Sequence, residues 1–375
     1  VIGYASTPTL QVVALGEIAK DTDDKHLYFR KTEQLLNPID YSIIKANEEL
    51  QGMECMAGGG RGTLFKVKEE EYEILMEIIR KENPSSSTST LEAYTDKEFL
   101  DEVFMSSSEL KRLKALLKEK KNIILQGAPG VGKTFTAKRL AYTLMGVKDE
   151  QRVEMVQFHQ NYSYEDFILG YKPNSEGGFE LKHGVFYKFC KKALNSPDKD
   201  FFFIIDEINR GNLSKIFGEL LMLIENGYRG QEIKLAYTDE LFTVPKNLYI
   251  IGMMNTADRS LAMIDYALRR RFSFFEMKPG FTTDGFKKYQ ALLAHEKLDN
   301  IIEGIQVLNE TISKDDSLGN GFCIGHSYFC QQKTFSLEWL ENVIEYDIEP
   351  MLKEYWFDDV QKYESHINKL RNLLK

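Results

Sequence analysis

The chain has 375 residues, of which 43% are hydrophobic and 28% charged, a balance that excludes a disordered or collagen-like protein. Its formal net charge of −9 argues against non-specific binding of nucleic acid over the whole surface. Four cysteines are too few for a disulfide framework, and no apolar run approaches the roughly 18 residues of a membrane helix. We therefore expect a cytoplasmic protein of two or three domains that does not contact a membrane.

Residues 1–83 are predicted to form a small β-rich domain closed by a helix. The segments Leu10–Ile18 and His26–Phe29 have the apolar composition of strands and are bounded by turn residues, and Arg61–Val67 is predicted as another strand. Apolar residues at helical spacing predict a helix over Lys68–Arg80. The domain has ten basic and fifteen acidic residues, so contacts with DNA would require a concentrated basic rim.

A linker rich in serine and threonine, residues 84–92, separates this domain from the rest of the chain. Strands and helices then alternate, which predicts an α/β fold with a parallel sheet over residues 93–277. From residue 278 the pattern is helical, which indicates a separate lid over residues 278–375. The expected elements are helices over Ser108–Lys120, from Lys133 and over Leu213–Glu225, and strands over Asn122–Gln126, Glu154–Phe158, Phe201–Ile205 and Leu248–Gly252.

A glycine-rich segment after the first of these strands matches the phosphate-loop pattern G-x-x-x-x-G-K-[ST]. Glycines allow several backbone N–H groups to point at one phosphate, and the helix that follows adds its positive end. Lys133 would reach the β- and γ-phosphates, and the Thr134 hydroxyl would bind Mg²⁺. The expected nucleotide-binding residues are Gly127, Ala128, Pro129, Gly130, Val131, Gly132, Lys133, Thr134 and Phe135.

Two further strands end in polar residues that suit catalysis. Asp206 and Glu207 follow a fully apolar strand, so Asp206 would hold Mg²⁺ and Glu207 would orient or deprotonate the attacking water. Asn255 follows the next strand and is a candidate for positioning that water, or else a residue that caps a turn. The tetrapeptide at 255–258 also has a superficial similarity to the guanine-reading motif of small GTPases.

Two clusters leave alternatives open. The three arginines at 269–271 follow the helix-like run Leu261–Leu268 and are either a solvated basic patch or a source of a catalytic arginine for a neighbouring subunit. Cys323, His326 and Cys330 are three potential metal ligands, but without a fourth they fall short of a zinc site.

Taken together, these motifs resemble the AAA+ ATPases and, more narrowly, the McrB family, the GTP-hydrolysing motor subunits of modification-dependent restriction systems. The resemblance runs from about Tyr94 to the end of the chain. It is carried by Val156–Gln160, Tyr164–Phe167, Asp206–Asn212, Met254–Ser260, Ala267–Phe272 and Ile324–Phe329.

The resemblance implies roles for residues that the motifs alone leave ambiguous. Asn255 takes the sensor-1 role, Arg269 and Arg270 become arginine fingers that act across a ring interface, and Arg210 lies at that interface. Gly325–Phe329 belongs to the lid beside the nucleotide. The resemblance also implies a hexameric ring, Mg²⁺ as cofactor, GTP favoured over ATP, modified DNA as a partner and a separate McrC-like nuclease subunit.

The N-terminal segment resembles an EVE or other PUA-like domain through Val1–Pro8, Val12–Ile18 and Arg61–Val67. Such domains hold a flipped, modified base against aromatic side chains. Tyr4 and Phe65 are candidate pocket residues by this resemblance, although aromatic residues of strands more often belong to the core.

Two other functions fit the same motifs. The chain could be an AAA+ ATPase that remodels a protein partner, which DNA would not stimulate. It could also be a nucleotide-gated binding module with negligible hydrolysis, although an intact Glu207 and Asn255 argue against this.

Overall fold

The computed structural model describes residues 1–5, 9–18, 29–57, 65–83, 91–174, 177–257, 266–330 and 332–375. The chain forms two compact units, Val1–Thr90 and Leu91–Lys375. Within the described ranges, every helix is too short or too polar to cross a membrane.

The first unit is a three-stranded antiparallel sheet with helices packed on it. Its core contains Val12, Ile39, Leu50 and Ile79, all nearly inaccessible to solvent. The sheet has the order β1-β2-β3, and the elements are β1 (Ile2–Ala5), β2 (Gln11–Ile18), β3 (Phe29–Asp40), α1 (Tyr41–Ala46), α2 (Glu54–Ala57) and α3 (Glu69–Glu82).

The strand expected over residues 61–67 is not confirmed. Residues 61–64 lie outside the described ranges, and residues 65–67 are not in a strand. The backbone N–H of Lys66 donates to the carboxylate of Glu54 at 2.7 Å, so a side chain takes the place of a strand partner here. Of the other expected strand at 26–29, only residue 29 is described, and it begins β3.

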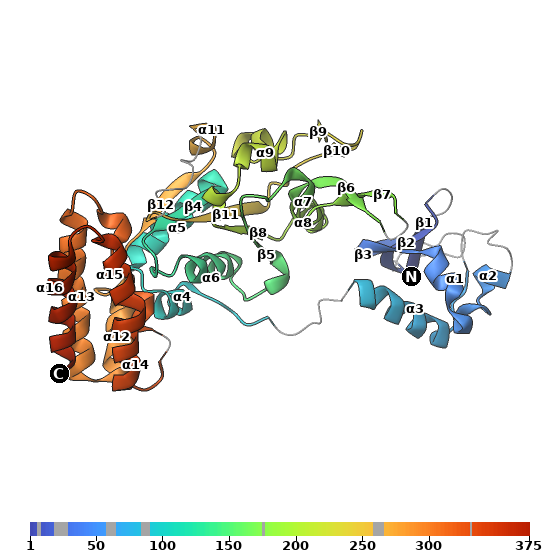
Figure 1. Ribbon diagram of the computed structural model, residues 1–375. Coiled ribbons are helices and arrows are strands. Elements are labelled where there is room, and N and C mark those ends of the chain that lie inside the picture. Colours follow the sequence, from blue (N-terminus) through green and yellow to red (C-terminus); the bar gives the residue numbers. More distant parts are fainter. Residues whose placement is uncertain are drawn as a thin grey trace. The chain divides into compact units, whose positions relative to one another are not determined.

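The second unit is built around a five-stranded sheet of order β12-β4-β11-β8-β5, in which all neighbours are parallel (Figure 1). The central strands are almost continuously apolar and buried, as expected where helices cover both faces. Parallel strands end at one edge, which therefore collects the residues that follow them. The strands are β4 (Asn122–Gly127), β5 (Val153–Gln157), β8 (Phe201–Asp206), β11 (Leu248–Asn255) and β12 (Ser273–Met277).

Helices on both sides of this sheet confirm the expected alternation. α5 begins with a capping box between Ser106 and Glu109 and buries Leu110, Leu113 and Leu117. The remaining helices of this part are α4 (Asp96–Glu102), α5 (Ser107–Lys120), α6 (Lys133–Met145), α7 (Tyr164–Phe167), α8 (Val185–Leu194), α9 (Leu213–Phe217), α10 (Leu220–Leu223) and α11 (Tyr266–Arg269).

The prediction of one helix over Leu213–Glu225 is wrong. The segment divides into α9 and α10 because Gly218 between them has a φ of +50°, which ends the first helix. A Cβ at Gly218 would lie 3.0 Å from the ring of Tyr164, so the turn also allows this ring to approach the backbone. Two hairpins that were not predicted project from the same region, β6 (Leu169–Pro173) with β7 (Phe179–His183) and β9 (Ile233–Lys234) with β10 (Leu241–Phe242).

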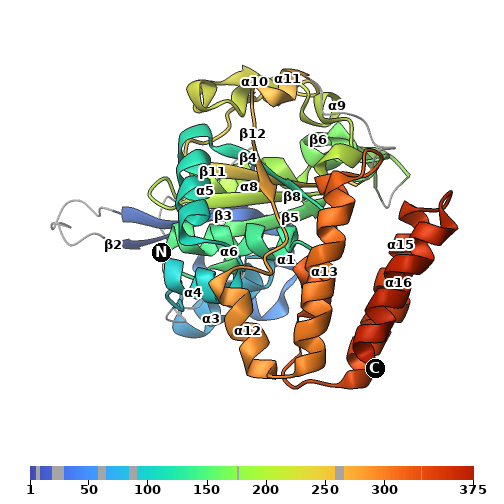
Figure 2. The same ribbon diagram turned by 90° about the vertical axis from the view of Figure 1, so that its left-hand side faces the viewer.

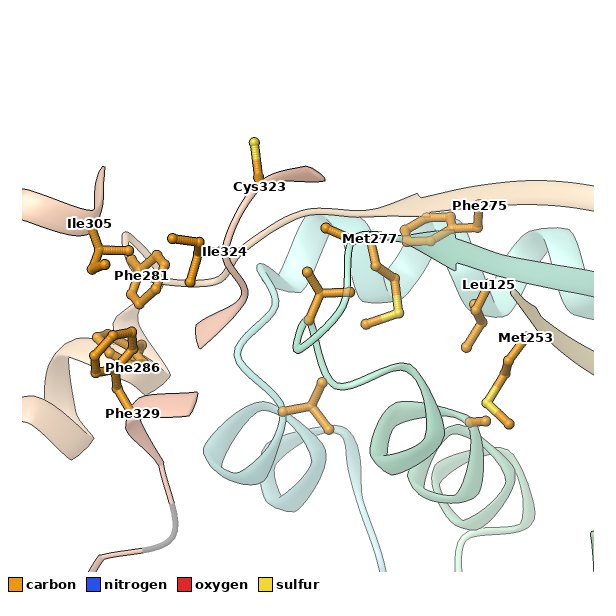
Figure 3. Close-up of a cluster of buried hydrophobic side chains, with 14 of the residues drawn as sticks. Leu125, Met253, Phe275, Met277, Phe281, Phe286, Ile305, Cys323, Ile324 and Phe329 are labelled. Atoms are coloured by element: carbon orange, nitrogen blue, oxygen red, sulfur yellow. The ribbon is translucent and has the colours of Figure 1, made fainter. Parts of the chain in front are cut away.

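A helical lid follows β12, with α13 lying beside α16 (Figure 2). One hydrophobic core joins lid and sheet: Leu125 and Met277 belong to the sheet, whereas Phe281, Phe286 and Phe329 belong to the lid (Figure 3). The lid elements are α12 (Asp284–Leu293), α13 (Glu296–Lys314), a 3₁₀ turn (His326–Phe329), α14 (Leu337–Asn342), a π-helical turn (Val343–Ile348), α15 (Glu349–Tyr355) and α16 (Val360–Leu374).

The edge of the sheet where the strands begin contains a buried arginine, Arg229, with 3% of its surface exposed. Its guanidinium donates to the carbonyls of Ile224 and Leu248 at 2.9 and 2.6 Å and to the side-chain oxygen of Asn122 at 2.6 Å. The amide of Asn122 in turn donates to the carbonyl of Arg271 at 3.0 Å. Burial lowers the pKa of Arg229 to about 10, so it remains charged at neutral pH.

Candidate functional site

The loop between β4 and α6 has the backbone geometry of a phosphate cradle. Gly130 and Gly132 both have a φ of +76°, a conformation that residues with a Cβ rarely adopt. A Cβ at Gly127 would lie 2.4 Å from the carbonyl oxygen of Met277, so this glycine is needed for close packing of β4 against β12. Helix α6 begins immediately after the loop, and its first N–H groups therefore face the same space as the loop backbone.

The side chain of Lys133 lies against the loop that precedes it. Its ammonium donates to the carbonyl oxygens of Gly127 and Ala128 at 3.0 and 2.9 Å. These bonds hold the positive charge at the loop, within reach of a phosphate bound to the loop's N–H groups.

The acidic residues at the end of β8 lie at the same edge of the sheet. Glu207 is one of the few residues other than glycine with a positive φ, +50°. Its side chain accepts hydrogen bonds from Asn255 Nδ2 at 2.8 Å and from Arg210 Nε at 3.1 Å, and its N–H donates to Asp206 Oδ1 at 3.1 Å. The carboxylate is therefore fixed in position by Asn255 of β11 and by Arg210 in the turn that follows Glu207.

A cleft of about 320 Å³ brings the predicted residues together. Lys133, Thr134, Asp206, Glu207 and Asn255 all line it, so one space holds the phosphate-loop lysine, a hydroxyl, two carboxylates and an amide. The lining residues are Gly130, Gly132, Lys133, Thr134, Phe135, Asp206, Glu207, Met254, Asn255 and Ser327.

The oxygen donors in this cleft fit Mg²⁺. Thr134 supplies a hydroxyl and Asp206 a carboxylate, and Mg²⁺ in nucleotide sites takes one or two such protein ligands beside phosphate oxygens and water. Among the described residues, no group of three or more His, Cys, Asp or Glu side chains is arranged to hold a metal. This excludes Cys323, His326 and Cys330 as a metal centre, and Nδ1 of His326 instead accepts a hydrogen bond from the N–H of Gly280 at 2.8 Å.

The arginines at 269–271 are not brought to this cleft. They precede Ser273, the first residue of β12, whereas Met277 at the end of that strand pairs with Gly127. At about 3.3 Å per residue, the arginines lie roughly 20 Å from the phosphate loop, at the opposite edge of the sheet. There Arg270 and Arg271 line a second cleft of about 340 Å³, and Arg271 pairs with Glu225 at 2.9 Å.

The lid also contributes residues to the site. The sequence motifs around the sheet strands do not identify these residues. The N–H of Ser327 donates to the carbonyl of Gly130 at 2.9 Å, and Ser327 lines the cleft. A Cβ at Gly325 would lie 2.0 Å from the carbonyl carbon of Gly130, so the two backbones are in direct contact. The sequence places Gly325–Phe329 near the nucleotide only through family resemblance, because nothing in its residue types is specific for phosphate.

Comparison with known proteins identifies this part of the chain. Residues 122–272 match the AAA domain of the dynein-related subfamily, and residues 300–364 match the α-helical lid domain of McrB. The second unit has an AAA+ fold, and its lid is similar to that of McrB. Its fold is accordingly the AAA+ P-loop fold with a helical lid.

The curated relatives of this AAA+ module are restriction enzyme components. The chain is 50% identical over 299 residues to the type IV methyl-directed restriction enzyme EcoKMcrB subunit of Escherichia coli strain K12, an alignment that covers 76% of the chain and 64% of that subunit. It is 28% identical over 194 residues to the type II restriction enzyme BsuMI component YdiS of Bacillus subtilis strain 168, covering 41% and 56%. The chain thus spans less than two thirds of the length of each relative.

Proposed function

We propose that the chain is the NTP-hydrolysing motor subunit of a modification-dependent DNA restriction complex, with GTP as its favoured substrate. The observation that carries the proposal is the single cleft shared by the phosphate-loop lysine, the two acidic residues and the sensor amide. This set of groups suits phosphoryl transfer to water, in which catalysis consists mainly of positioning and charge stabilisation.

Each residue of the cleft has a proposed task. The loop N–H groups and Lys133 bind the β- and γ-phosphates, while Glu207 orients the attacking water and accepts its proton. Asn255 holds Glu207 and the water in place, as its 2.8 Å hydrogen bond to Glu207 supports. Mg²⁺, when held by Thr134 and Asp206, would neutralise charge on the phosphate oxygens.

The position of the arginines supports action between subunits. Arg269 and Arg270 lie at the edge of the sheet opposite the phosphate loop, so they cannot complete the site of their own chain. A head-to-tail ring would bring the arginine edge of one subunit to the cleft of the next. We propose a ring, a hexamer by family resemblance, in which these arginines act as fingers.

The roles in DNA cleavage rest on the relatives. The E. coli relative is a methyl-directed restriction enzyme subunit, which supports modified DNA as a partner. We propose a translocation role and a separate McrC-like nuclease by family resemblance. For the N-terminal unit we propose EVE/PUA-like reading of a modified base. Tyr4 is 45% exposed, so its ring is accessible to a base, and the centroid of its ring lies 6.0 Å from that of Tyr41. Phe65 stays a further candidate.

Nucleotide binding and hydrolysis, measured with GTP and ATP alongside oligomer size, test the proposal. We expect the wild-type chain to bind GTP more tightly than ATP and to form a larger assembly when it does. Lys133→Ala should abolish binding of both nucleotides, because it removes the charge that faces the phosphates.

Lys138→Ala is the matched control for this experiment. This lysine lies on the same helix and pairs with Glu150 at 2.7 Å on the surface, a contact worth at most about 1 kcal/mol, so its loss should leave binding intact. Unchanged binding by Lys133→Ala would contradict the proposed site. A preference for ATP, without stimulation by modified DNA, would favour an AAA+ remodeller of proteins. Assembly on nucleotide with negligible turnover would favour a nucleotide-gated module.

A further inference from the structure

Phe135 is an exposed aromatic side chain in the nucleotide cleft, and the proposed hydrolysis gives it no task. Of the side chains that line the cleft in the described part of the chain, only Phe135 and Met254 are apolar, and only Phe135 is aromatic. Its exposed fraction is 43%, although a phenyl ring can neither hydrogen-bond a phosphate nor bind Mg²⁺. The ring therefore suits a part of the nucleotide other than the phosphates.

The guanidinium of Arg139 covers one face of this ring. Arg139 follows Phe135 by four residues on α6, so the two side chains share one face of the helix. The guanidinium carbon lies 3.1 Å from the ring centroid, a cation–π contact. Because one face is covered, the exposed area of the ring belongs mainly to its other face and its edge. Side chains of a helix lean towards its N-terminus, which directs this ring towards the phosphate loop.

A chain of polar contacts holds Arg139 in this position. Its Nε donates to Oε2 of Glu102 on α4 at 2.5 Å, and the same oxygen accepts from the hydroxyl of Tyr94 at 3.0 Å. Tyr94 is fully buried, so its hydroxyl holds the carboxylate from the interior of the protein. The ring of Phe135 is thus backed by a guanidinium whose own position is fixed.

The acidic residues of the cleft lie on one side of the phosphate loop. Asp206 and Asn255 end β8 and β11, which lie on one side of β4 in the sheet, whereas β12 and the lid that follows it lie on the other. Under the proposed function the attacking water is placed by Glu207 and Asn255, so the γ-phosphate faces the acidic side. The nucleoside must then extend towards the lid side, where Ser327 lines the cleft.

Phe135 also belongs to this lid side. Helix α4, to which Arg139 is bonded, packs between α6 and the lid helix α12 (Figure 1). Asp101 of α4 pairs with Lys288 of α12 at 3.4 Å. The open face of the ring and the nucleoside are therefore expected at the same end of the cleft.

We propose that the open face of Phe135 stacks on the purine base of the bound triphosphate, and that Arg139, held by Glu102, positions the ring. Stacking on an aromatic ring tolerates any base, because every base has a π-face, and differences between bases come from the strength of stacking. Phe135 therefore favours purines over the smaller pyrimidines but does not itself distinguish guanine from adenine. This inference rests on the proposed nucleotide site and adds the residue that contacts the base.

Equilibrium binding of GTP, ATP and CTP to the full chain tests the inference. Phe135→Leu keeps an apolar side chain and removes the aromatic face, so it should lower the affinity for GTP and ATP about tenfold and the affinity for CTP less. Phe135→Trp should retain both purine affinities. Phe357→Leu is the matched control, because Phe357 of the lid is 80% exposed and does not line the cleft, and it should bind all three nucleotides as the wild type does.

A fluorescent base reports the stacking directly. The fluorescence of 2-aminopurine is quenched when the base stacks, so 2-aminopurine riboside triphosphate should be quenched on binding to the wild-type chain and quenched less, at saturation, by Phe135→Leu. Arg139→Gln removes the guanidinium and should lower the GTP affinity about threefold, with reduced quenching at saturation. A purely structural loss would lower the affinity and leave the quenching of the bound probe unchanged.

The outcomes distinguish this inference from the proposed function. Equal affinity of the wild type and Phe135→Leu for GTP would overturn the role of Phe135, as would an equal loss for GTP and CTP, or unchanged quenching of the bound probe. Unchanged quenching in Arg139→Gln would overturn the positioning role of Arg139. Failure of the wild-type chain to bind any triphosphate would instead contradict the nucleotide site itself.

Discussion

Glu207 adopts a left-handed backbone conformation, with a φ of +50°, that costs a glutamate about 1–2 kcal/mol. Strain of this kind persists only where the surrounding structure holds it. Here the hydrogen bonds from Asn255 and Arg210 hold the side chain. The conformation turns the carboxylate of Glu207 into the cleft that Asp206 also lines, so two successive acids can serve different tasks.

Glu207→Gln should separate binding from hydrolysis. Glutamine keeps an oxygen that accepts from Asn255 but cannot take a proton from water, so we expect nucleotide affinity close to wild type and turnover reduced at least about 100-fold. Single-turnover hydrolysis and equilibrium binding measure the two effects. Glu150→Gln, at a surface pair with Lys138, is the control that should hydrolyse normally. Wild-type turnover in Glu207→Gln would remove this residue from the mechanism.

At the scale of single residues, the sequence predicted those site residues that directly follow a buried strand. Asp206, Glu207 and Asn255 follow apolar strands, and parallel strands must end at one edge. For His326 the sequence offers a metal ligand, from its spacing to Cys323 and Cys330, and by family resemblance a lid residue beside the nucleotide, but not its contacts. Its partner Gly280 is 46 residues away, a contact that no local pattern contains.

At the scale of elements, the lid and the phosphate loop meet through two glycines, Gly325 and Gly130. A Cβ at Gly325 would lie 2.0 Å from the carbonyl carbon of Gly130. Because both partners are backbone atoms, a change of side-chain rotamer could not remove the clash. The 3₁₀ turn His326–Phe329 starts at this contact. The orientation of the lid is therefore coupled to the conformation of the loop.

Gly325→Ala should disturb this contact. The added methyl group forces the two backbones apart, at a cost of about 1–3 kcal/mol, and should weaken nucleotide binding together with thermal stability. Gly227→Ala is the control, since nothing lies within 4 Å of a Cβ at that position. Thermal unfolding with and without GTP measures both effects. An unchanged melting temperature and affinity in Gly325→Ala would show that the contact is not needed.

Helices and strands were predicted where their sequence signals lie within the element, and missed where their limits involve contacts with distant residues. The helix at Ser107–Lys120 carries its own capping box and apolar stripe. At the break, Gly218 lies against the ring of Tyr164, more than fifty positions earlier, a contact that no local pattern contains. Strand β12 was not predicted because it follows directly on the arginines, and its place next to β4 is fixed by pairing across the sheet.

At the scale of the whole molecule, the sheet separates the arginines from the cleft that they are proposed to serve. Arg269 ends α11, just before β12, and Met277 at the far end of β12 pairs with Gly127. This polarity follows from the parallel topology, and under the proposed role of the arginines a neighbouring subunit would have to supply them. The parallel sheet was predicted from the sequence, but the order of its strands was not, because it is set by contacts between segments far apart in the chain.

Mixed assemblies test whether the arginines act between subunits. A double variant, Arg269→Ala with Arg270→Ala, and the variant Glu207→Gln should each be inactive alone. Mixed in equal amounts, they should recover about one quarter of the wild-type rate, because a cleft with an intact Glu207 then meets intact arginines from its neighbour. GTP hydrolysis against mixing ratio measures this recovery.

A second mixture provides the control. Lys133→Ala and Glu207→Gln alter the same cleft, so no combination of the two chains contains a complete site, and their mixture should stay inactive. Absence of recovery in the arginine mixture, in assemblies of normal size, would rule out action across the interface.

The buried Arg229 and Asn122 fix the start of strand β4, whose other end opens the phosphate loop. Asn122, the first residue of β4, is bonded to the carbonyl of Arg271, and the last residue of the strand, Gly127, opens the phosphate loop. The strand spans about 20 Å and, locked between its neighbours in the sheet, cannot bend or stretch appreciably. A displacement at the arginine edge would therefore be transmitted along this strand to the phosphate loop. In the proposed ring, every subunit would carry such a connection between its neighbour's cleft and its own.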